Sequence, residues 1–434
     1  MEAFHAHGLP DGNRVAELET LLRTAVFKPV NALVETLLQQ ALERIEAACQ
    51  PKPGERPKGR EPLVVQGIFG SFTLRRRYYH HAGKKTGHYP ADAALGLEGS
   101  YTPALARLIC LEGADESSFQ KGSLHLWDVG AIKVDQRQIQ RVVHRVGPEV
   151  AAWQRRESMP GATAARVLYV SADATGVPMR RAELVGRKGQ AADGVAKTRM
   201  AWLGCVFTQQ KQDDEGHPLR DHESTTYLSG FESISDFGIG LRREAIRRGL
   251  GTAPETVLLV DGATGLEKMG RDYFVGATQI VDLYHALEHL GEVAGLLVGK
   301  SDPAKLERRR AHWKKMLLAG GVDRIIKAAR KEALKKGNIA GVEAARGYFL
   351  NNRERRQYGA FRAKGYFIGS GVIEAGCRTV MGQRCKQSGM FWSEAGASSI
   401  LALRSINASG HLQDYWKHRR NSHAAKNDLL PLAA

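Results

Sequence analysis

The sequence predicts an α/β protein in which a mixed β-sheet is interrupted by a helical segment and preceded by a mainly helical region with a β-hairpin. Two observations carry this prediction. Short apolar runs between residues 166 and 285 have the length and composition of strands that are buried on both faces. Elsewhere, apolar residues recur at spacings of three and four, which indicates amphipathic helices. Strands that first follow one another and then alternate with helices are typical of a mixed sheet.

The composition is that of a large globular protein. A chain of 434 residues suggests several domains, and 43% hydrophobic with 25% charged residues excludes a disordered chain. The sequence contains no run of 18 apolar residues, and its first residues lack the pattern of a secretory signal. We therefore expect a cytoplasmic protein with no membrane partner. Five cysteines without a C-x-x-C pair argue against a disulfide framework and a zinc knuckle.

The charge balance points to a polyanionic partner. The chain has 63 Lys and Arg against 46 Asp and Glu, a formal net charge of +17. Cations attract a phosphate backbone through the release of counterions. Because many basic proteins bind nothing specific, this charge indicates nucleic acid only together with other signals.

Residues 1–62 are predicted to form N-terminal helices and a linker. Apolar spacing over residues 15–48 indicates two helices that are broken near Pro29. The prolines, glycines and alternating charges of residues 50–62 indicate a solvated linker. Residues 63–100 then have the pattern of a β-hairpin that ends in arginines and tyrosines. Such a cluster suits contact with nucleic acid, or protects an exposed edge strand.

Residues 101–150 are predicted to form a helix-turn-helix-like DNA-binding region. A serine can cap the first helix and Asp135 the second, which Gly147 and Pro148 are expected to stop. A helix of this kind can place cations against a DNA duplex, although a solvated amphipathic helix has the same pattern. The arginines expected to contact DNA recur every four residues on the second helix: Arg137, Arg141 and Arg145.

Residues 155–285 are predicted to form the first part of the sheet. The runs VLYVSADA, RMAWLGCVFTQ, ETVLLVDG and TQIVD indicate strands. Asp173 and Asp261 each end such a run and are followed by small residues. Because sites in α/β folds lie at the carboxyl ends of strands, we expect these two acids to meet at one edge of the sheet.

The remainder of the chain is predicted to leave the sheet and return to it. Residues 286–365 have no strand pattern and many cations, which indicates a helical insertion. Residues 366–410 are expected to complete the core with a final helix that begins near Ser370 and contains Glu374. Residues 411–434 are polar and are expected to form a loosely ordered tail.

The three acids predict a divalent-metal site. Two neighbouring carboxylates need a cation to neutralise them, and a third acid is needed to hold two ions. Glu374 is the candidate, because it is the one acid between residues 359 and 393. Mg²⁺ takes oxygen ligands and binds through a few carboxylates, with water and phosphate completing its shell. We therefore predict two Mg²⁺ (or Mn²⁺) ions held by Asp173, Asp261 and Glu374.

Four motifs, in this order, resemble those of DDE transposases with a ribonuclease-H-like core, in particular bacterial insertion-sequence transposases of the ISKra type, which are related to the Mutator-like group. The motifs are SADATGVP, LLVDGATG, DLYHALEHL and GSGVIEAGCRTVMGQRCKQSGMFW. The resemblance implies a ribonuclease-H-like sheet in which Asp173, Asp261 and Glu374 bind two metal ions. It also implies that Asp282 and His285 form a D-x-x-H signature of uncertain role. Asp282 can equally be read as a helix N-cap.

The resemblance implies a reaction and a partner. The reaction is hydrolysis of phosphodiester bonds at the terminal inverted repeats of an element, followed by attack of the freed 3′ hydroxyl on target DNA. The partner is double-stranded DNA, bound by a homodimer or higher oligomer that is nucleoid-associated when bound. Arg378 can clamp a phosphate or pair with Glu374. The cations around Glu374 that are expected to bind DNA are Arg378, Arg384 and Lys386.

Other functions fit the sequence less well. The same core serves metal-dependent nucleases and resolvases, and an inactive element can leave a DNA-binding protein. An aspartyl-phosphate phosphohydrolase needs a second acid two residues after the first, where this chain has Thr175. In the resembled family the segment after the hairpin often carries a cysteine pair, which this chain lacks; a zinc site there would depend on His80, His81 and His88.

Overall fold

The computed structural model describes residues 12–51, 53–81, 83, 87–156, 159, 161–189, 194–299, 302–337 and 339–425. The chain divides into two compact units. Unit 1 contains Met1–Val143 and Gln413–Ala434, and unit 2 contains His144–Leu412. Within the described ranges, no helix is both long and apolar enough to cross a membrane. The outer ends of the predicted N-terminal region and tail, residues 1–11 and 426–434, lie outside the described residues.

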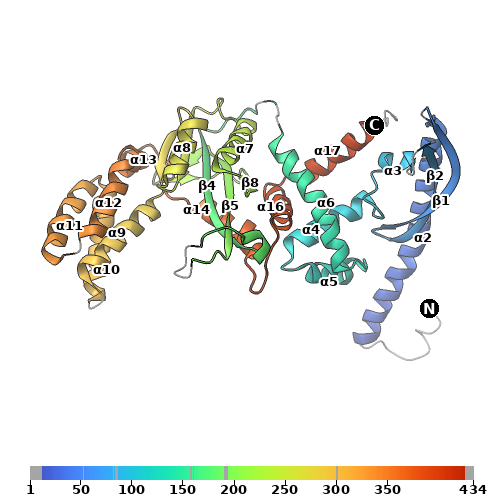
Figure 1. Ribbon diagram of the computed structural model, residues 1–434, viewed down its shortest axis with the longest axis horizontal. Helices are drawn as coiled ribbons and strands as arrows, with labels where there is room; N and C mark the ends of the chain where they lie inside the picture. The colour runs from blue at the N-terminus through green and yellow to red at the C-terminus, as the bar shows by residue number, and fades with distance from the viewer. Residues whose placement is uncertain are drawn as a thin grey trace. The chain divides into compact units, whose positions relative to one another are not determined.

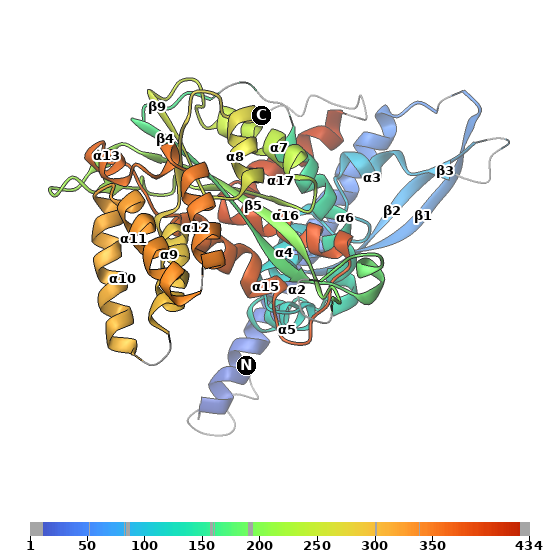
Figure 2. The same cartoon turned by 60° about the vertical axis from the view of Figure 1, so that its left-hand side comes forward.

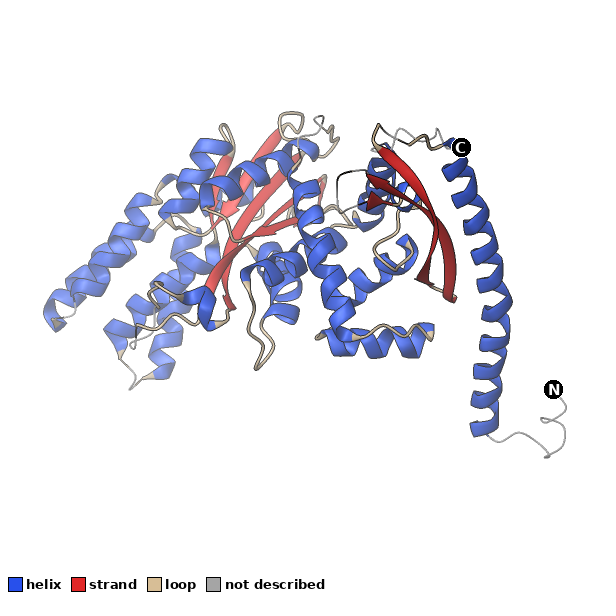
Figure 3. Cartoon of the chain, turned by 45° about the vertical axis from the view of Figure 1, so that its right-hand side comes forward, coloured by secondary structure: helices blue, strands red, loops and turns tan. Residues whose placement is uncertain are grey.

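Unit 1 begins with one long helix, α2 (Gly12–Ala48), where the sequence predicts two. Pro29 lies inside it. An internal proline costs a helix about 3 kcal/mol, but α2 packs an apolar face against the hairpin (Figure 3). Burial of this face offsets the missing hydrogen bond, since tertiary packing supplies most of the stability of a helix in a protein. The residues of this shared core include Val34, Leu38, Leu42, Val65, Phe72 and Leu74.

The predicted linker is largely a strand. Strand β1 (Glu55–Gly67) pairs antiparallel with β2 (Gly70–His81), which pairs with the short β3 (Gly87–His88). The prolines of β1 are tolerated because β1 is the edge strand of this three-stranded sheet. The register shifts between Pro57 and Arg60, so the turn-forming residues of this segment are accommodated as an irregularity of the strand.

Four helices follow in the chain. They are α3 (Pro90–Ala94), α4 (Pro103–Asp115), α5 (Phe119–Gly130) and α6 (Gln136–Arg155). The Ser118 side chain caps α5 by accepting the Lys121 N–H. Three of these helices, α4, α5 and α6, contain most of residues 101–150, and a short connection joins α5 to α6.

Helix α6 does not stop at Gly147 and Pro148, contrary to prediction. Gly147 permits close packing instead: a Cβ there would lie 2.4 Å from the Ser399 Cβ. Val146 and Val150 on either side are fully buried. The helix therefore continues because its apolar face is covered on both sides of the proline.

The predicted tail contains a helix. Helix α17 (Leu412–Ala425) lies almost entirely in unit 1. Tyr415 and Trp416 are buried, and the buried Arg419 forms an ion pair with the buried Glu98. Two adjacent aromatic residues and a buried ion pair therefore anchor a segment whose average polarity predicts loose order.

Unit 2 is built on a five-stranded mixed sheet. Its strands are β4 (Val167–Pro178), β5 (Thr198–Gln209), β8 (Thr226–Gly230), β9 (Glu255–Val260) and β10 (Thr278–Val281). The spatial order is β10-β9-β4-β5-β8. Strands β4, β5 and β8 pair antiparallel, whereas β9 and β10 run parallel to β4. This arrangement confirms the predicted mixed α/β sheet, and a two-stranded ribbon, β6 (Lys211–Gln212) with β7 (Pro218–Leu219), follows β5.

Helices cover both faces of this sheet (Figure 1). Helix α7 (Ile234–Arg247) packs at Gly204, where a Cβ would lie 2.7 Å from Leu241. Helix α14 (Gly371–Gly376) packs on the opposite face, where a Cβ at Gly376 would lie 3.0 Å from Leu203. Leu203 and Gly204 are neighbours on β5, and neighbouring residues of a strand point to opposite faces of the sheet. Helices α7 and α14 therefore pack on opposite faces.

Two further helices complete these layers. Helix α8 (Thr264–Tyr273) joins the α7 side through Leu266 and Met269. Helix α16 (Glu394–Ala408) joins the α14 side, where the Ser405 and Ser229 hydroxyls lie 2.8 Å apart.

The residues predicted to form a helical insertion are largely helical where the structure describes them. This part of the chain contains α9 (Leu283–Val298), α10 (Pro303–Leu318), α11 (Val322–Lys336), α12 (Ile339–Asn351) and α13 (Tyr358–Ala363), which gather beside the sheet (Figure 2). Their cations lie mostly on outer surfaces and their apolar residues inside. The chain then returns to the sheet through α14.

A methyl group added at Gly147 tests the packing of α6. We expect Gly147→Ala to lower the free energy of unfolding by about 1–3 kcal/mol, because the added carbon overlaps Ser399. Gly295→Ala on α9 is the matched control. Its Cβ would meet nothing within 4 Å, so it should raise this free energy by about 0.5–1 kcal/mol. Denaturant unfolding measures both, and equal changes would contradict close packing at Gly147.

Candidate active site at the carboxyl edge of the sheet

Three aspartates occupy equivalent positions on three adjacent parallel strands. Ala172 of β4 pairs with Val260 of β9, and Val260 pairs with Val281 of β10. An aspartate directly follows each of these three paired residues: Asp173 within β4, and Asp261 and Asp282 just after the ends of β9 and β10. Neighbouring strands lie about 4.8 Å apart, so the sheet itself brings these carboxylates to one edge.

Asp173 lies inside β4, and not at its end as predicted. Strand β4 continues to Pro178 along β5, and Asp173 pairs with Leu203. The parallel pairing with β9 ends one residue earlier, at Ala172. Asp173 is therefore at the carboxyl edge with respect to β9, and burial changes from complete to partial at this residue.

The side chain of Asp173 lies where its charged form is poorly solvated. Its Oδ1 accepts the Ala174 N–H at 2.7 Å, and its Oδ2 accepts the Cys377 thiol at 3.5 Å. Burial raises the pKa of Asp173, and the nearby Asp261 raises it further, against the hydrogen bonds and His285. Burial also raises the pKa of Cys377, which keeps the thiol protonated and able to donate. A cation at this edge would relieve both contributions to the raised pKa of Asp173.

The loop that carries Asp261 is braced by the helical insertion. Asp261 Oδ1 accepts the Ala263 N–H at 2.8 Å, and its backbone carbonyl accepts the buried Arg355 guanidinium at 3.3 Å. Tyr348 of α12 lies against Gly262, where a Cβ would be 2.3 Å from its ring. The insertion thus fixes the backbone at the second acid. Sequence reasoning missed Arg355 and Tyr348, although the glycine directly after Asp261 was a signal of close approach.

Glu374 lies on α14, three residues before the Cys377 that contacts Asp173. Its side chain is exposed. Its Oε1 accepts the Ser370 hydroxyl at 2.6 Å. The structure therefore places α14 beside Asp173, but it does not bring the ligand oxygens of Asp173, Asp261 and Glu374 all within 4.8 Å of one another. Sequence reasoning assigned Ser370 to helix capping and missed its bond to Glu374.

Asp282 and His285 differ in exposure. Asp282 is fully buried and caps α9, because its Oδ2 accepts the His285 N–H at 2.9 Å. Its Oδ1 accepts the Ser370 N–H at 2.7 Å. The His285 ring is half-buried and lies 3.3 Å from Glu288. The predicted N-cap is thus present.

The cations predicted to bind DNA fall into two groups. Arg137, Arg141 and Arg145 are exposed on α6, as are Arg378 and Lys386 near the acids; the Lys386 ammonium donates to the Thr175 hydroxyl. Arg384 departs from the prediction, because it is 1% exposed. Its guanidinium contacts Met390 Sδ at 3.1 Å and lies over the Trp392 ring, and burial lowers its pKa to about 10. Arg384 supports the packing beneath the site and is not presented to a phosphate backbone.

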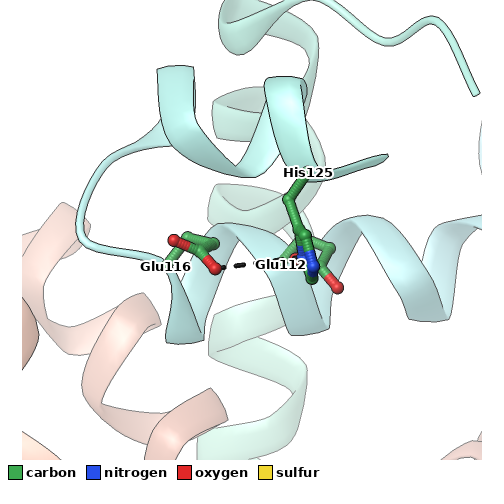
Figure 4. A group of neighbouring side chains, drawn as sticks. All are labelled: Glu112, Glu116 and His125. Atoms are coloured by element: carbon green, nitrogen blue, oxygen red, sulfur yellow. Dashed lines mark hydrogen bonds and ion pairs between the residues drawn. The ribbon is translucent and has the colours of Figure 1, made fainter. Parts of the chain in front are cut away.

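A separate group of possible ligands lies in unit 1 (Figure 4). Among the described residues, Glu112, Glu116 and His125 are the one set of three whose ligand atoms lie within 4.8 Å of one another. His125 Nδ1 is 2.6 Å from Glu112 and 3.9 Å from Glu116. The hydrogen bond to Glu112 raises the pKa of His125. Pairing of a cationic imidazole with two carboxylates accounts for this arrangement without an ion. The histidines at positions 80, 81 and 88 form no such cluster in the described part of the chain.

Neutralising Asp173 should stabilise the metal-free protein. The pKa of Asp173 is raised in the folded state, so the protonated side chain adds to the stability of the fold at low pH. This contribution to stability is lost as the pH rises through that pKa. We expect Asp173→Asn to raise the unfolding temperature at pH 7 in a chelating buffer, by less at acidic pH. Asp213→Asn is the control, and it should lower the unfolding temperature at pH 7. Hydrogen bonds from His217 lower the pKa of Asp213, so the charged form of this side chain favours the folded state. A lower unfolding temperature for Asp173→Asn would show that this carboxylate stabilises the fold.

Comparisons with known proteins give limited similarity. Residues 10–189 match the family described as "Uncharacterised protein family (UPF0236)". The chain is 22% identical over 378 residues to "UPF0236 protein in vanSb 3'region" of Streptococcus gallolyticus, a match that covers 82% of this chain and 75% of the relative. A solved structure titled "Drosophila P element transposase strand transfer complex" superimposes with a TM-score of 0.25 and 11% identity, covering 79% of this chain and 83% of that one. A TM-score of this size does not establish a shared fold.

Proposed function

We propose that this chain is a DDE transposase with a ribonuclease-H-like core, which binds the ends of a DNA element, cuts them and joins them to target DNA. The observation that carries the proposal is that Asp173 and Asp261 each directly follow the last paired residues, Ala172 and Val260, of two adjacent parallel strands. Two carboxylates held side by side, one of them with a raised pKa, are an unfavourable arrangement for folding alone. Perturbed acids of this kind are typical of functional sites.

The sheet topology supports the proposed core. Three antiparallel strands are followed by two strands parallel to the first, in the order β10-β9-β4-β5-β8. Ligands of α/β folds bind outside the carboxyl ends of strands, where the order of strands reverses direction. Here β4 lies between β9 and β5, and Asp173 is on β4 at this reversal.

The donor set fits Mg²⁺ or Mn²⁺. All three proposed ligands are carboxylates, which hard divalent ions prefer. Asp173 and Asp261 are half-buried and Glu374 is exposed, so none of the three carboxylates is enclosed by the protein. When bound, a pair of such ions would activate an attacking oxygen and stabilise a leaving one in phosphodiester cleavage.

The residues around the acids have roles that follow from their contacts. The Cys377 thiol and the Ala174 N–H orient Asp173, while Arg355 and Tyr348 hold the loop of Asp261. The remaining exposed cations beside the site suit a phosphate backbone, since each adds a charge-assisted contact. These are Arg378 and Lys386.

Single substitutions of the acids test the proposed activity. With Mg²⁺ and duplex DNA that carries the ends of the chain's own element, the wild-type protein should nick the ends and join them to a target. Asp173→Asn, Asp261→Asn or Glu374→Gln should each reduce nicking by more than about 100-fold, because outer-shell changes alone cost about 10- to 100-fold. End binding, measured without Mg²⁺ by mobility shift, should be retained.

The products separate the candidate activities. Nicks without joined products would favour a metal-dependent nuclease over a transposase. Normal cleavage by Asp173→Asn would show that the acids have been assigned wrongly.

The α6 arginines should set part of the salt dependence of DNA binding. Replacing Arg137, Arg141 and Arg145 with alanine should reduce the slope of log K against log salt by about 1 for each phosphate that is no longer neutralised. The matched control replaces three exposed lysines with the same spacing on α11, and so removes the same charge: Lys327, Lys331 and Lys335. Filter binding over a salt series measures both, and equal slopes for the two triple variants would contradict a specific role for α6.

A further inference from the structure

The carboxyl edge of the sheet holds three aspartates, but the structure presents only two of them to a ligand. Asp173 and Asp261 are half-buried, whereas Asp282 is 0% exposed. Each directly follows the last residue at which its strand pairs in parallel with its neighbour: Ala172, Val260 and Val281. Their different exposure means that the third aspartate is used by the protein itself.

Both oxygens of Asp282 accept backbone N–H groups. Oδ2 accepts from His285 at 2.9 Å and so caps α9, and Oδ1 accepts from Ser370 at 2.7 Å. A backbone hydrogen bond links the same two segments a second time: the Leu283 N–H donates to the Ile368 carbonyl at 2.9 Å. Asp282 thus joins the end of β10 to Ser370, the residue directly before α14. Because Asp282 is buried and both of its oxygens already accept backbone N–H groups, it is shielded from a metal ion.

Ser370 extends this connection to Glu374. Its hydroxyl donates to Glu374 Oε1 at 2.6 Å, and its carbonyl accepts the N–H groups of Ile373 at 2.9 Å and Glu374 at 3.1 Å. Ser370 is buried, whereas Glu374 is exposed, so the hydroxyl bond joins a shielded donor to a side chain that faces solvent. The hydroxyl bond restrains a long, exposed side chain that would otherwise sample several rotamers. Because each carboxylate oxygen accepts separately, a bond at Oε1 leaves Oε2 available to a cation.

We propose that Asp282 and Ser370 are positioning residues that orient Glu374 toward the metal site, and that Asp282 is not itself a ligand. This inference rests on the proposed function, in which Glu374 is the third metal-binding acid. It assigns a role to the aspartate of the D-x-x-H motif. Partners that orient a ligand in this way change metal affinity or activity by about 10- to 100-fold.

The decisive variant is Ser370→Ala, which removes the hydroxyl and keeps the N–H that Asp282 accepts. We expect Mn²⁺ to bind about 10-fold more weakly, measured on the full chain by electron paramagnetic resonance of free Mn²⁺. The Mg²⁺ concentration for half-maximal nicking should rise by a similar factor, while the affinity for element ends without metal stays the same. Ser370→Thr retains the hydroxyl and should recover most of the Mn²⁺ affinity.

The control for a purely structural effect is Ser393→Ala. Ser393 caps α16 by accepting the Gly396 N–H at 3.2 Å, so its loss should lower the unfolding temperature without changing Mn²⁺ affinity. Asp282→Asn replaces one acceptor oxygen by a donor and should reproduce the weaker Mn²⁺ binding with a lower unfolding temperature. Ser370→Ala keeps the test valid even if Asp282→Asn does not fold.

The outcomes separate the two proposals. Unchanged Mn²⁺ affinity and Mg²⁺ dependence in Ser370→Ala, with nicking abolished in Glu374→Gln, would overturn the positioning role and leave the proposed function intact. Wild-type nicking by Glu374→Gln would overturn the assignment of the third acid, and the positioning role with it. Weaker Mn²⁺ binding in Ser370→Ala but not in Ser393→Ala supports the proposal.

Discussion

The sheet of unit 2 holds neighbouring carboxylates at a partly buried edge, and the proposed site depends on this one electrostatic constraint. The pairing of Ala172 with Val260 brings the two residues that follow, Asp173 and Asp261, to one edge of the sheet, and burial raises the pKa of Asp173. Two like charges at this spacing repel, and removal from water makes each charge more costly. Folding alone gives no reason to keep such a pair, but a divalent cation or a scissile phosphate with its ions would relieve both costs.

The surrounding elements hold the acids in place and do not neutralise them. Arg355 donates to the backbone carbonyl of Asp261, not to its carboxylate. Tyr348 packs against Gly262, and the Cys377 thiol is a weak donor to Asp173. The helical insertion therefore has a structural role in addition to its positive charge, because its residues hold the loop that carries Asp261. This is how a binding site is expected to be built, with rigid support behind ligands whose charges remain available.

The sequence predicted the mixed sheet and the position of Asp261 because buried strands leave continuous apolar runs. It did not predict that β4 passes through Asp173, since pairing with β5 alone carries the strand onward. Helices α2 and α6 contain Pro29 and Pro148 against expectation, because tertiary packing outweighs local breaking signals.

Burial explains the other differences from the sequence prediction. Arginine is normally a surface residue, but Arg384 is buried against the Trp392 ring. The segment predicted to be a loose tail is held in place by the buried aromatic residues Tyr415 and Trp416. Long-range contacts such as that between Ser370 and Asp282 leave no periodic signal in a single sequence.

Anomalous diffraction from crystals soaked in Mn²⁺ would show whether the sheet edge binds metal, because it locates the ion independently of activity. We expect an anomalous peak coordinated by Asp173 and Asp261, with Glu374 turned toward it and Asp282 still bonded to backbone N–H groups. An empty sheet edge at saturating Mn²⁺, with ions bound elsewhere on the chain, would contradict the proposed metal site.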